Sequence, residues 1–155
     1  MSGKHILVLG LGNLLLSDEG VGIHVIRELQ KKSFPKNISI VDGGTGGFEL
    51  IRYFRGMEKV IIIDALKSDD KPGSVFRFTP DEFRSAELHP FSSHQGGLSE
   101  LLNEIKKLDP SPEIIIYGIV PGETRQYNME LSRDVKRTIP VLTFLLTKEI
   151  KNDIN

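Results

Sequence analysis

The sequence predicts a three-layer α/β/α domain around a mainly parallel, twisted sheet of five strands. Short, nearly continuous apolar runs alternate with segments of helical periodicity, which is the pattern of successive βα units. The apolar runs lack polar alternation, as expected of strands buried on both faces of a parallel sheet. The 155 residues contain no repeat and no linker, so we expect one domain over 1–155, with only 151–155 frayed.

Three buried strands are predicted in the first half of the chain, at residues 5–10, 38–41 and 59–63. The third is purely aliphatic and is expected to end at Asp64. Helical periodicity predicts a helix over 19–32, because its apolar residues share one face. A shorter helix is expected over 48–54, where Phe48 and Phe54 lie in a helical apolar pattern.

The second half begins with residues 74–79, which alternate like a half-exposed strand and which we place antiparallel or at an edge of the sheet. Thr79 and Pro80 then have the pattern of a helix N-cap followed by proline at the first helical position. Three further elements are expected: a helix over 98–108, the last core strand over 113–119 and a terminal helix from 132. Pro140 should kink that helix or split it in two.

Composition excludes several classes of function. The chain carries 20 Lys and Arg against 21 Asp and Glu, so electrostatics predict neither a nucleic-acid nor a membrane partner. The first apolar run, residues 6–16, is too short to span a bilayer and lacks the cleavage site of a signal peptide. We therefore expect a cytoplasmic protein, and a monomer, because nothing indicates a large exposed apolar surface.

The sequence contains no cysteine, which excludes disulfides, a thiol nucleophile, an all-cysteine zinc site and a protein-ligated iron–sulfur cluster. Any metal must be bound by His, Asp, Glu or backbone atoms. Only four histidines are available. His5 and His89 are expected to be structural or exposed, and His24 is an ambiguous supporting candidate.

Ligands of open α/β sheets bind beyond the carboxyl ends of the strands, which directs attention to the loop after Gly10. A dinucleotide-binding fingerprint would require a third glycine at position 15, which is Leu15. Asp18 and Glu19 would also repel a phosphate. The simplest alternative to a ligand-binding loop is a tight glycine turn, after which Asp18 or Glu19 begins the following helix.

Other acids follow the next two strands. Asp42 opens a loop with four glycines in five residues, where it either caps a turn or contacts a ligand. Asp64 follows an aliphatic strand, so its carboxylate must be hydrogen-bonded, paired or bound to a cation. His94 precedes the 98–108 helix. Glu19, Asp64 and His94 should meet at one sheet edge, and this mixed oxygen and nitrogen set suits nickel or zinc.

A set of ordered motifs makes a family resemblance specific. These motifs are Gly10-Leu-Gly-Asn13, Leu15-Leu-Ser-Asp-Glu19-Gly-Val-Gly22, Asp42-Gly-Gly-Thr45, Ile63-Asp64-Ala65, Ser93-His94-Gln95-x-Gly97-Leu98 and Gly118-Ile-x-Pro121. Together they resemble the [NiFe]-hydrogenase maturation endopeptidases. The resemblance runs from the first strand to the loop after the last core strand.

The resemblance implies cleavage of a C-terminal extension from the hydrogenase large-subunit precursor after nickel insertion. The family's three metal-binding positions fall on Glu19, Asp64 and His94, and the first of them is Asp or Glu across the family. The nickel-loaded precursor is thus the implied partner. The isolated site is compatible with another divalent cation such as zinc or cadmium. The family is commonly grouped with the aspartic-type peptidases.

The residues alone do not identify the group that cleaves the peptide bond. The metal could polarise the scissile carbonyl or a water, or a carboxylate could activate water. For the carboxylate we favour Asp42, with Asp18 behind it. The Asp42 glycine loop and Gly122–Arg125 are expected to grip the extension. Two alternatives stay open: a nucleotide- or small-molecule-binding α/β domain without peptidase activity, and a peptidase with a different substrate.

Overall fold

The computed structural model describes residues 3–86, 89–90, 97–122 and 127–154. Its elements are, in chain order, β1 (Ile6–Gly10), η1 (Ser17–Gly20), α1 (Val21–Gln30), β2 (Ile38–Asp42), η2 (Phe48–Phe54), β3 (Lys59–Lys67), β4 (Val75–Phe78), α2 (Pro80–Ser85), β5 (His89–Pro90), α3 (Leu98–Ile105), β6 (Glu113–Ile119), α4 (Arg133–Lys136) and α5 (Thr138–Ile154). Among these described helices, none is long and apolar enough to cross a membrane.

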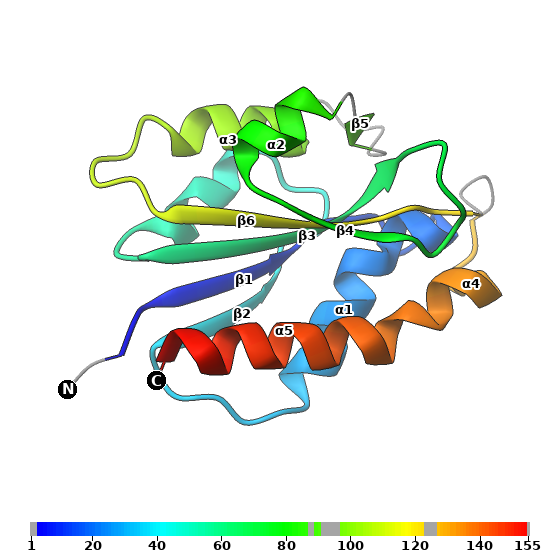
Figure 1. Cartoon of the computed structure of the whole chain (residues 1–155), viewed down its shortest axis with the longest axis horizontal. Coiled ribbons are helices and arrows are strands. Elements are labelled where there is room, and N and C mark those ends of the chain that lie inside the picture. The colour runs from blue at the N-terminus through cyan, green and yellow to red at the C-terminus, as the bar shows by residue number, and fades with distance from the viewer. Residues whose placement is uncertain (1–2, 87–88, 91–96, 123–126, 155) are drawn as a thin grey trace.

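The strands form a twisted sheet in the order β2-β1-β3-β6-β4 (Figure 1). β1, β2, β3 and β6 run parallel, whereas β4 pairs antiparallel with β6 at one edge. The two residues of β5 pair antiparallel with the end of β3. The predicted fold class, with its antiparallel edge strand, is confirmed.

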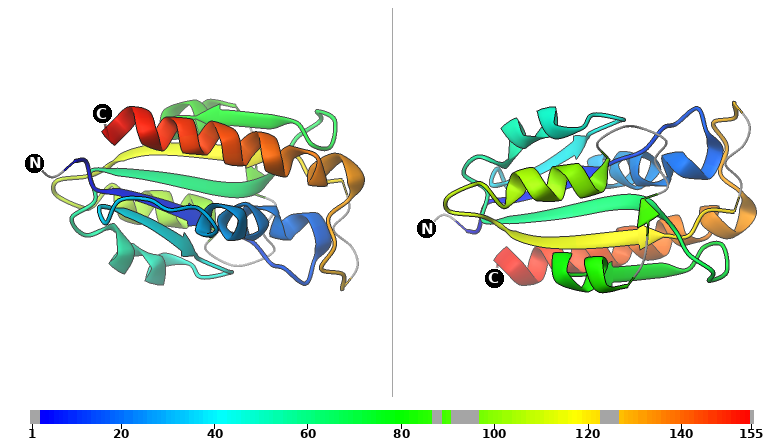
Figure 2. Two further views of the ribbon diagram at one scale, coloured as in Figure 1. Left: turned by 90° about the horizontal axis from the view of Figure 1, so that it is seen from below. Right: turned by 90° about the horizontal axis from the view of Figure 1, so that it is seen from above.

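Helices cover both faces of the sheet (Figure 2). α1 and α5 pack against one another on one face, and α3 packs against η2 on the other. The strands divide their side chains between two apolar clusters: Ile6 and Val8 of β1 contact the α1–α5 side, while Leu7 and Leu9 contact the η2–α3 side. Because both faces of β1, β3 and β6 are buried, most positions in these strands are apolar, which is why their sequence lacks alternation.

Two glycines set the distance between α1 and the sheet. A Cβ atom at Gly10 would lie 2.5 Å from the carbonyl oxygen of Gly22, and one at Gly22 would lie 2.5 Å from that of Ile63. Only glycine allows the helix backbone to approach the strands this closely. The contact holds η1 and the start of α1 beside the carboxyl ends of β1 and β3.

Two predicted boundaries differ from the structure. β3 does not end at Asp64 but continues to Lys67, because β6 pairs with it as far as Ala65 and β5 pairs with its last two residues. Asp64 therefore lies inside the strand, opposite Gly118. The first helix starts at Val21, and the acids before it belong to the 3-10 turn η1.

The C-terminal helical segment is split in two, as predicted. α4 ends at Lys136 and α5 begins at Thr138. Pro140 lies in the first turn of α5, where its missing N–H breaks no helical hydrogen bond. The last turn, where fraying is expected, is helical through Ile154, whose side chain packs against the core.

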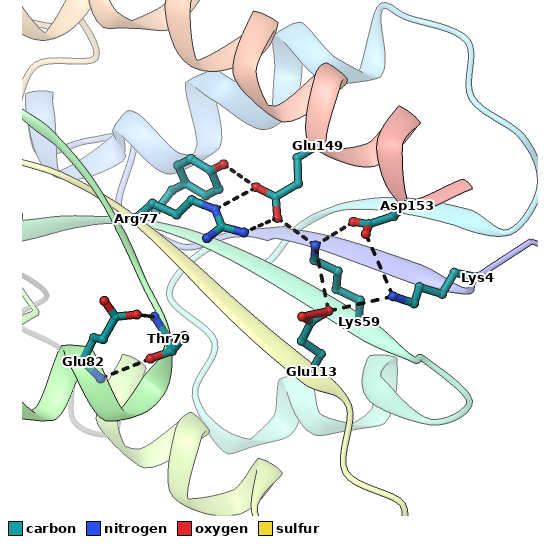
Figure 3. A network of polar contacts seen from close by, with 9 residues as sticks. Lys4, Lys59, Arg77, Thr79, Glu82, Glu113, Glu149 and Asp153 are labelled. Atoms are coloured by element: carbon teal, nitrogen blue, oxygen red, sulfur yellow. Dashed lines mark hydrogen bonds and ion pairs between the residues drawn. The ribbon is translucent and has the colours of Figure 1, made fainter. Parts of the chain in front are cut away.

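An ion-pair network ties α5 to the amino end of the parallel strands (Figure 3). Lys59, the first residue of β3, is only 4% exposed, and its Nζ lies 2.6 Å from Asp153 Oδ2 and 2.8 Å from Glu149 Oε2. Glu149 also accepts two hydrogen bonds of 3.0 Å from Arg77 and one from the Tyr117 hydroxyl. The network thus joins α5 to β3, β4 and β6.

This network predicts a loss of stability in acid. Burial by itself raises the pKa of Glu149, but hydrogen bonds from Arg77, Lys59 and Tyr117 outweigh it and lower the pKa from 4.5 to about 2. The ionised carboxylate therefore stabilises the fold above pH 4.5, and this contribution, roughly 2–3 kcal/mol, is lost as pH falls toward 2. The free energy of unfolding, measured with urea across this range, should fall less steeply with decreasing pH in Glu149→Gln than in the wild type. We call this part of the pH profile the acid limb.

The matched control is Glu28→Gln, because Glu28 forms a single ion pair with Lys31 at an exposed position. Its acid limb should follow that of the wild type. An acid limb that is equally steep in Glu149→Gln would contradict a dominant role for the Glu149 carboxylate.

Candidate active site

Two acids from separate elements lie close together at the carboxyl end of the sheet. Glu19 is on η1, which follows β1, and Asp64 is in β3, the strand beside β1. Glu19 is 4% exposed and Asp64 is 1% exposed. The negative charge of Glu19 raises the pKa of Asp64, so the two carboxylates are electrostatically coupled. The expectation that these acids approach one another is thereby supported.

Asp64 is held in an unusual state for a carboxylate. Its Oδ1 accepts a hydrogen bond of 2.8 Å from the backbone N–H of Ala65. Its buried Oδ2 has no hydrogen-bond partner among the described residues. Burial raises the pKa of Asp64 to about 7, with a further increase from Glu19 and a partial decrease from the Ala65 bond. Such a group binds either a proton or a cation near neutral pH.

A small cavity of about 10 Å³ adjoins Asp64, which is room for one water-sized atom. Its walls come from Leu11 and Gly12 after β1, from the glycine loop 44–46 after β2, and from Gly97 before α3. The cavity is too small for a dinucleotide. The loops after β1 and β2 and the residue before α3 therefore meet at the Asp64 carboxylate.

His94 lies outside the described residues, three positions before Gly97 in the sequence. In the described ranges, no group of three His, Asp or Glu side chains is arranged to bind a metal ion. The described part of the site therefore contributes two carboxylates, Glu19 and Asp64. The three-residue metal set stays a prediction.

Asp42 begins the glycine loop that walls the cavity but does not line the cavity itself. Its Oδ1 accepts a hydrogen bond of 2.9 Å from the N–H of Gly44, which closes a tight turn at the end of β2. Gly44 is at φ 52° and accepts a hydrogen bond from Gly12 N–H. Asp42 is exposed, so its carboxylate is accessible to a substrate or to water.

Asp18 is completely buried and is bonded on both carboxylate oxygens. Oδ1 accepts from the N–H of Ser132 at 2.7 Å, and Oδ2 accepts from the Ser132 hydroxyl at 2.5 Å and from the N–H of Gly122 at 2.8 Å. These bonds tie η1 to the loop after β6 and to the start of α4. They give Asp18 a structural role, as a tether for the segment that carries Glu19.

We therefore expect Asp18→Ala to destabilise the fold by about 2–4 kcal/mol, because three part-buried hydrogen bonds would lose their acceptor. Processing should fall because the segment carrying Glu19 loosens, and chemical denaturation should detect the lost stability. Asp42→Ala is the comparison, and its exposed carboxylate should cost no more than about 1 kcal/mol. If Asp18→Ala were fully stable and yet inactive, Asp18 would be catalytic rather than structural.

The serines around Asp18 were not among the predicted site residues. Ser17 is 1% exposed and at φ 48°, a left-handed conformation that is uncommon for a residue other than glycine. Its hydroxyl donates to the carbonyl of Glu130 at 2.6 Å. Ser132 is 114 positions away from Asp18 in sequence, so no local pattern could identify this pair.

The remaining predicted residues have less defined roles. His5 is exposed. His24 is half-buried on α1; burial and the nearby Arg27 lower its pKa, and its Nε2 is buried without a hydrogen-bond partner in the described structure. For His89 only the backbone pairing of β5 is described. Of the segment expected to grip a peptide, Gly122 bonds to Asp18, and 123–125 lie outside the described residues.

The arrangement of β1, η1 and β3 can now be compared with known proteins. The sequence profile of the hydrogenase maturation proteases matches residues 23–149, which is most of the chain. The chain belongs to the hydrogenase maturation protease family. This confirms the resemblance found in the motifs and makes the protein a peptidase of hydrogenase maturation, in place of a nucleotide-binding domain without peptidase activity.

Individual relatives agree with this assignment. The protease is 33% identical over 119 residues to the hydrogenase 2 maturation protease of Escherichia coli, which covers 75% of this chain and 73% of the relative. The solved structure of the hydrogenase maturating endopeptidase HybD from E. coli is similar to it with a TM-score of 0.82 at 26% identity, over 96% of this chain and 93% of HybD. The [NiFe] hydrogenase maturation protease HybD from Thermococcus kodakarensis gives a TM-score of 0.77 at 30% identity, over 94% and 98% of the two chains.

Proposed function

We propose that this protease removes a C-terminal extension from a [NiFe]-hydrogenase large-subunit precursor after nickel insertion, and that Glu19, Asp64 and His94 contact the nickel. The observation that carries the proposal is the Asp64 carboxylate, which is buried beside Glu19 with Oδ2 unpartnered in the described structure. Two acids brought together in a dry site repel one another, and a divalent cation relieves this repulsion.

The nickel belongs to the substrate in this proposal. The protease has no cysteine, so thiolates that hold the ion must come from the precursor. Glu19 and Asp64 would add oxygen ligands and His94 an imidazole nitrogen, a set that suits nickel. A precursor without nickel offers nothing for these groups to bind. The protease can therefore distinguish loaded from unloaded precursor by one directional contact.

For the cleavage step we favour Asp42 as the group that takes a proton from the attacking water. Its carboxylate is exposed beside the cavity, whereas that of Asp18 is occupied by three hydrogen bonds. The resulting hydroxide would add to the scissile carbonyl, and the proton would pass to the departing amide nitrogen. In this proposal a carboxylate activates the water, which is the chemistry of an aspartic-type peptidase.

The decisive experiment is mass spectrometry of a hydrogenase large-subunit precursor after incubation with the protease, with and without nickel. We expect shortening of the precursor only in the nickel-loaded sample. Cleavage of both samples would contradict nickel recognition. Cleavage of neither, with a precursor from the same organism, would point to a different peptidase substrate.

Single substitutions separate recognition from chemistry. Glu19→Gln, Asp64→Asn and His94→Ala should each weaken binding of the loaded precursor, whereas Asp42→Asn should keep binding and lose cleavage. Glu104→Gln is the matched control, because Glu104 only pairs with Lys107 on the surface of α3. If all three of the first variants processed loaded precursor at the normal rate, the proposed metal contact would be wrong.

A further inference from the structure

A second feature of the surface lies outside the candidate active site. A groove of about 960 Å³ runs along α1 and α5, on the opposite face of the sheet from α3. Its volume is in the range of established binding pockets. Its apolar lining residues, called here the apolar floor, include Met129, Ile139 and Phe144, of which Met129 is 50% exposed and Phe144 61% exposed. Exposed apolar side chains collected in a groove indicate a binding surface.

The walls of the groove are basic. Five of its lining residues are lysines, and two, Glu28 and Glu130, are acids. Lys31 is paired with Glu28 at 2.8 Å. The other four, Lys32, Lys136, Lys148 and Lys151, form no ion pair within the described structure, and Lys148 lies 5.3 Å above the Phe144 ring. The groove therefore has a positive charge, although the whole chain has a net charge of −1.

One end of the groove adjoins the candidate active site. Met129 and Glu130 line this end. The segment that carries them is bonded to Ser17, which donates from its N–H to Asn128 and from its hydroxyl to Glu130, both at 2.6 Å. Ser17 begins η1, the turn that carries Glu19. The groove and the turn that carries Glu19 are thus joined by one hydrogen-bonded segment, so a single protein substrate can contact both.

We propose that this groove binds an acidic amphipathic helix of the hydrogenase large-subunit precursor, an inference that rests on the proposed function. The apolar face of such a helix would cover Met129 and Phe144, and its acids would face the unpaired lysines. A helix in a hydrophobic groove is a recurrent mode of peptide recognition. The groove then holds the precursor while its C-terminal extension reaches the cavity beside Asp64.

Other occupants fit the groove less well. In a two-fold dimer the same face would meet itself, so lysines would lie against lysines. A nucleic-acid backbone would match the lysines but would leave the apolar floor without a partner. The acidic amphipathic helix satisfies both properties together.

The test uses the double charge reversal Lys32→Glu/Lys148→Glu, which changes one lysine on each side of the groove. The control is Lys36→Glu/Lys106→Glu, which reverses the same number of exposed lysines elsewhere. Lys106 also follows the end of a helix, as Lys32 does, so effects on a helix dipole are matched. Thermal unfolding confirms that both variants fold. Phe144→Ser then tests the apolar floor separately.

Binding of nickel-loaded precursor to full-length protease is measured directly, and cleavage is measured in parallel. We expect the groove variant to bind at least about tenfold more weakly, with less dependence on salt, and to cleave at nearly the normal rate once saturated. The control should bind as the wild type does. Phe144→Ser should also weaken binding.

Unchanged affinity of the groove variant, or no binding of precursor to the wild type, would overturn the inference. A concentration-dependent dimer that the groove variant abolishes would also overturn it, in favour of a second copy. If the precursor binds through the groove and is not cleaved, the groove proposal stands and the proposed function fails. Binding and cleavage therefore test the two proposals separately.

Discussion

Asp64→Asn is expected to abolish precursor processing and, at the same time, to stabilise the folded protein above pH 7. The pKa of Asp64 is about 7 in the folded state against an ordinary value of 3.8. The folded state therefore binds an extra proton between these values, and wild-type stability should decline as pH rises from about 4 through 7. The asparagine variant has no such decline. The free energy of unfolding of Asp64→Asn should exceed that of the wild type by a small amount at pH 5 and by roughly 1–3 kcal/mol at pH 8.

Denaturant unfolding at the two pH values, with a chelator present, measures this effect without any contribution from bound metal. Asp42→Asn is the control, because its carboxylate is exposed, and its stability should differ little from that of the wild type at either pH. A loss of stability at pH 8 in Asp64→Asn would mean that the native fold already satisfies the ionised carboxylate. A stabilised, inactive variant would identify Asp64 as a residue retained for function at the expense of stability.

Lys59→Met is expected to cause the largest loss of stability of any single substitution considered, about 3–5 kcal/mol at neutral pH. Burial by itself lowers the pKa of Lys59, but its bonds to Asp153 and Glu149 reverse this and raise the pKa, so the side chain stays charged. Removal of the ammonium leaves two mostly buried carboxylates of α5 without their shared partner. Chemical denaturation should show the loss, and α5 should become more open to hydrogen exchange.

Lys4→Met is the matched control for this prediction. Lys4 approaches Asp153 and Glu113 at 3.9 and 4.0 Å but is 39% exposed, so its loss should cost less than about 1 kcal/mol. Similar losses in the two variants would contradict the assignment of the network to Lys59. The network lies at the amino end of β3, far along the strand from Asp64, so Lys59→Met should reduce processing only through the folded fraction.

Local sequence patterns predicted a helix or strand correctly where the residues of that segment alone determine its structure. The aliphatic run before Asp64 and the Thr79–Pro80 cap both form the expected structure, and the cap is a complete capping box with Glu82. Errors occurred where a neighbour decides the outcome. β3 continues past Asp64 because β6 pairs with it, and that pairing is not encoded in the 59–67 segment alone.

The same distinction applies to the residues of the candidate site: the sequence could locate some of them but could not assign the role of others. Glu19 and Asp64 could be located from strand order, since the carboxyl ends of parallel strands share one edge. The role of Asp18 could not, because Ser132 and Gly122 reach it from more than a hundred positions away. From its sequence position, Asp18 is as good a candidate as Glu19. In the fold Asp18 instead tethers the turn that carries Glu19.

The sequence alone determined the fold class and the family and selected Glu19 and Asp64 as candidate site residues, because periodicity, glycine placement and motif order are properties of neighbouring positions. Only the tertiary structure decided how those residues behave. Burial beside Glu19 raises the pKa of Asp64, Ser132 converts Asp18 into an anchor, and α1 and α5 together create a basic groove. Desolvation, charge coupling and surface shape depend on residues that are distant in the chain, so no local pattern contains them.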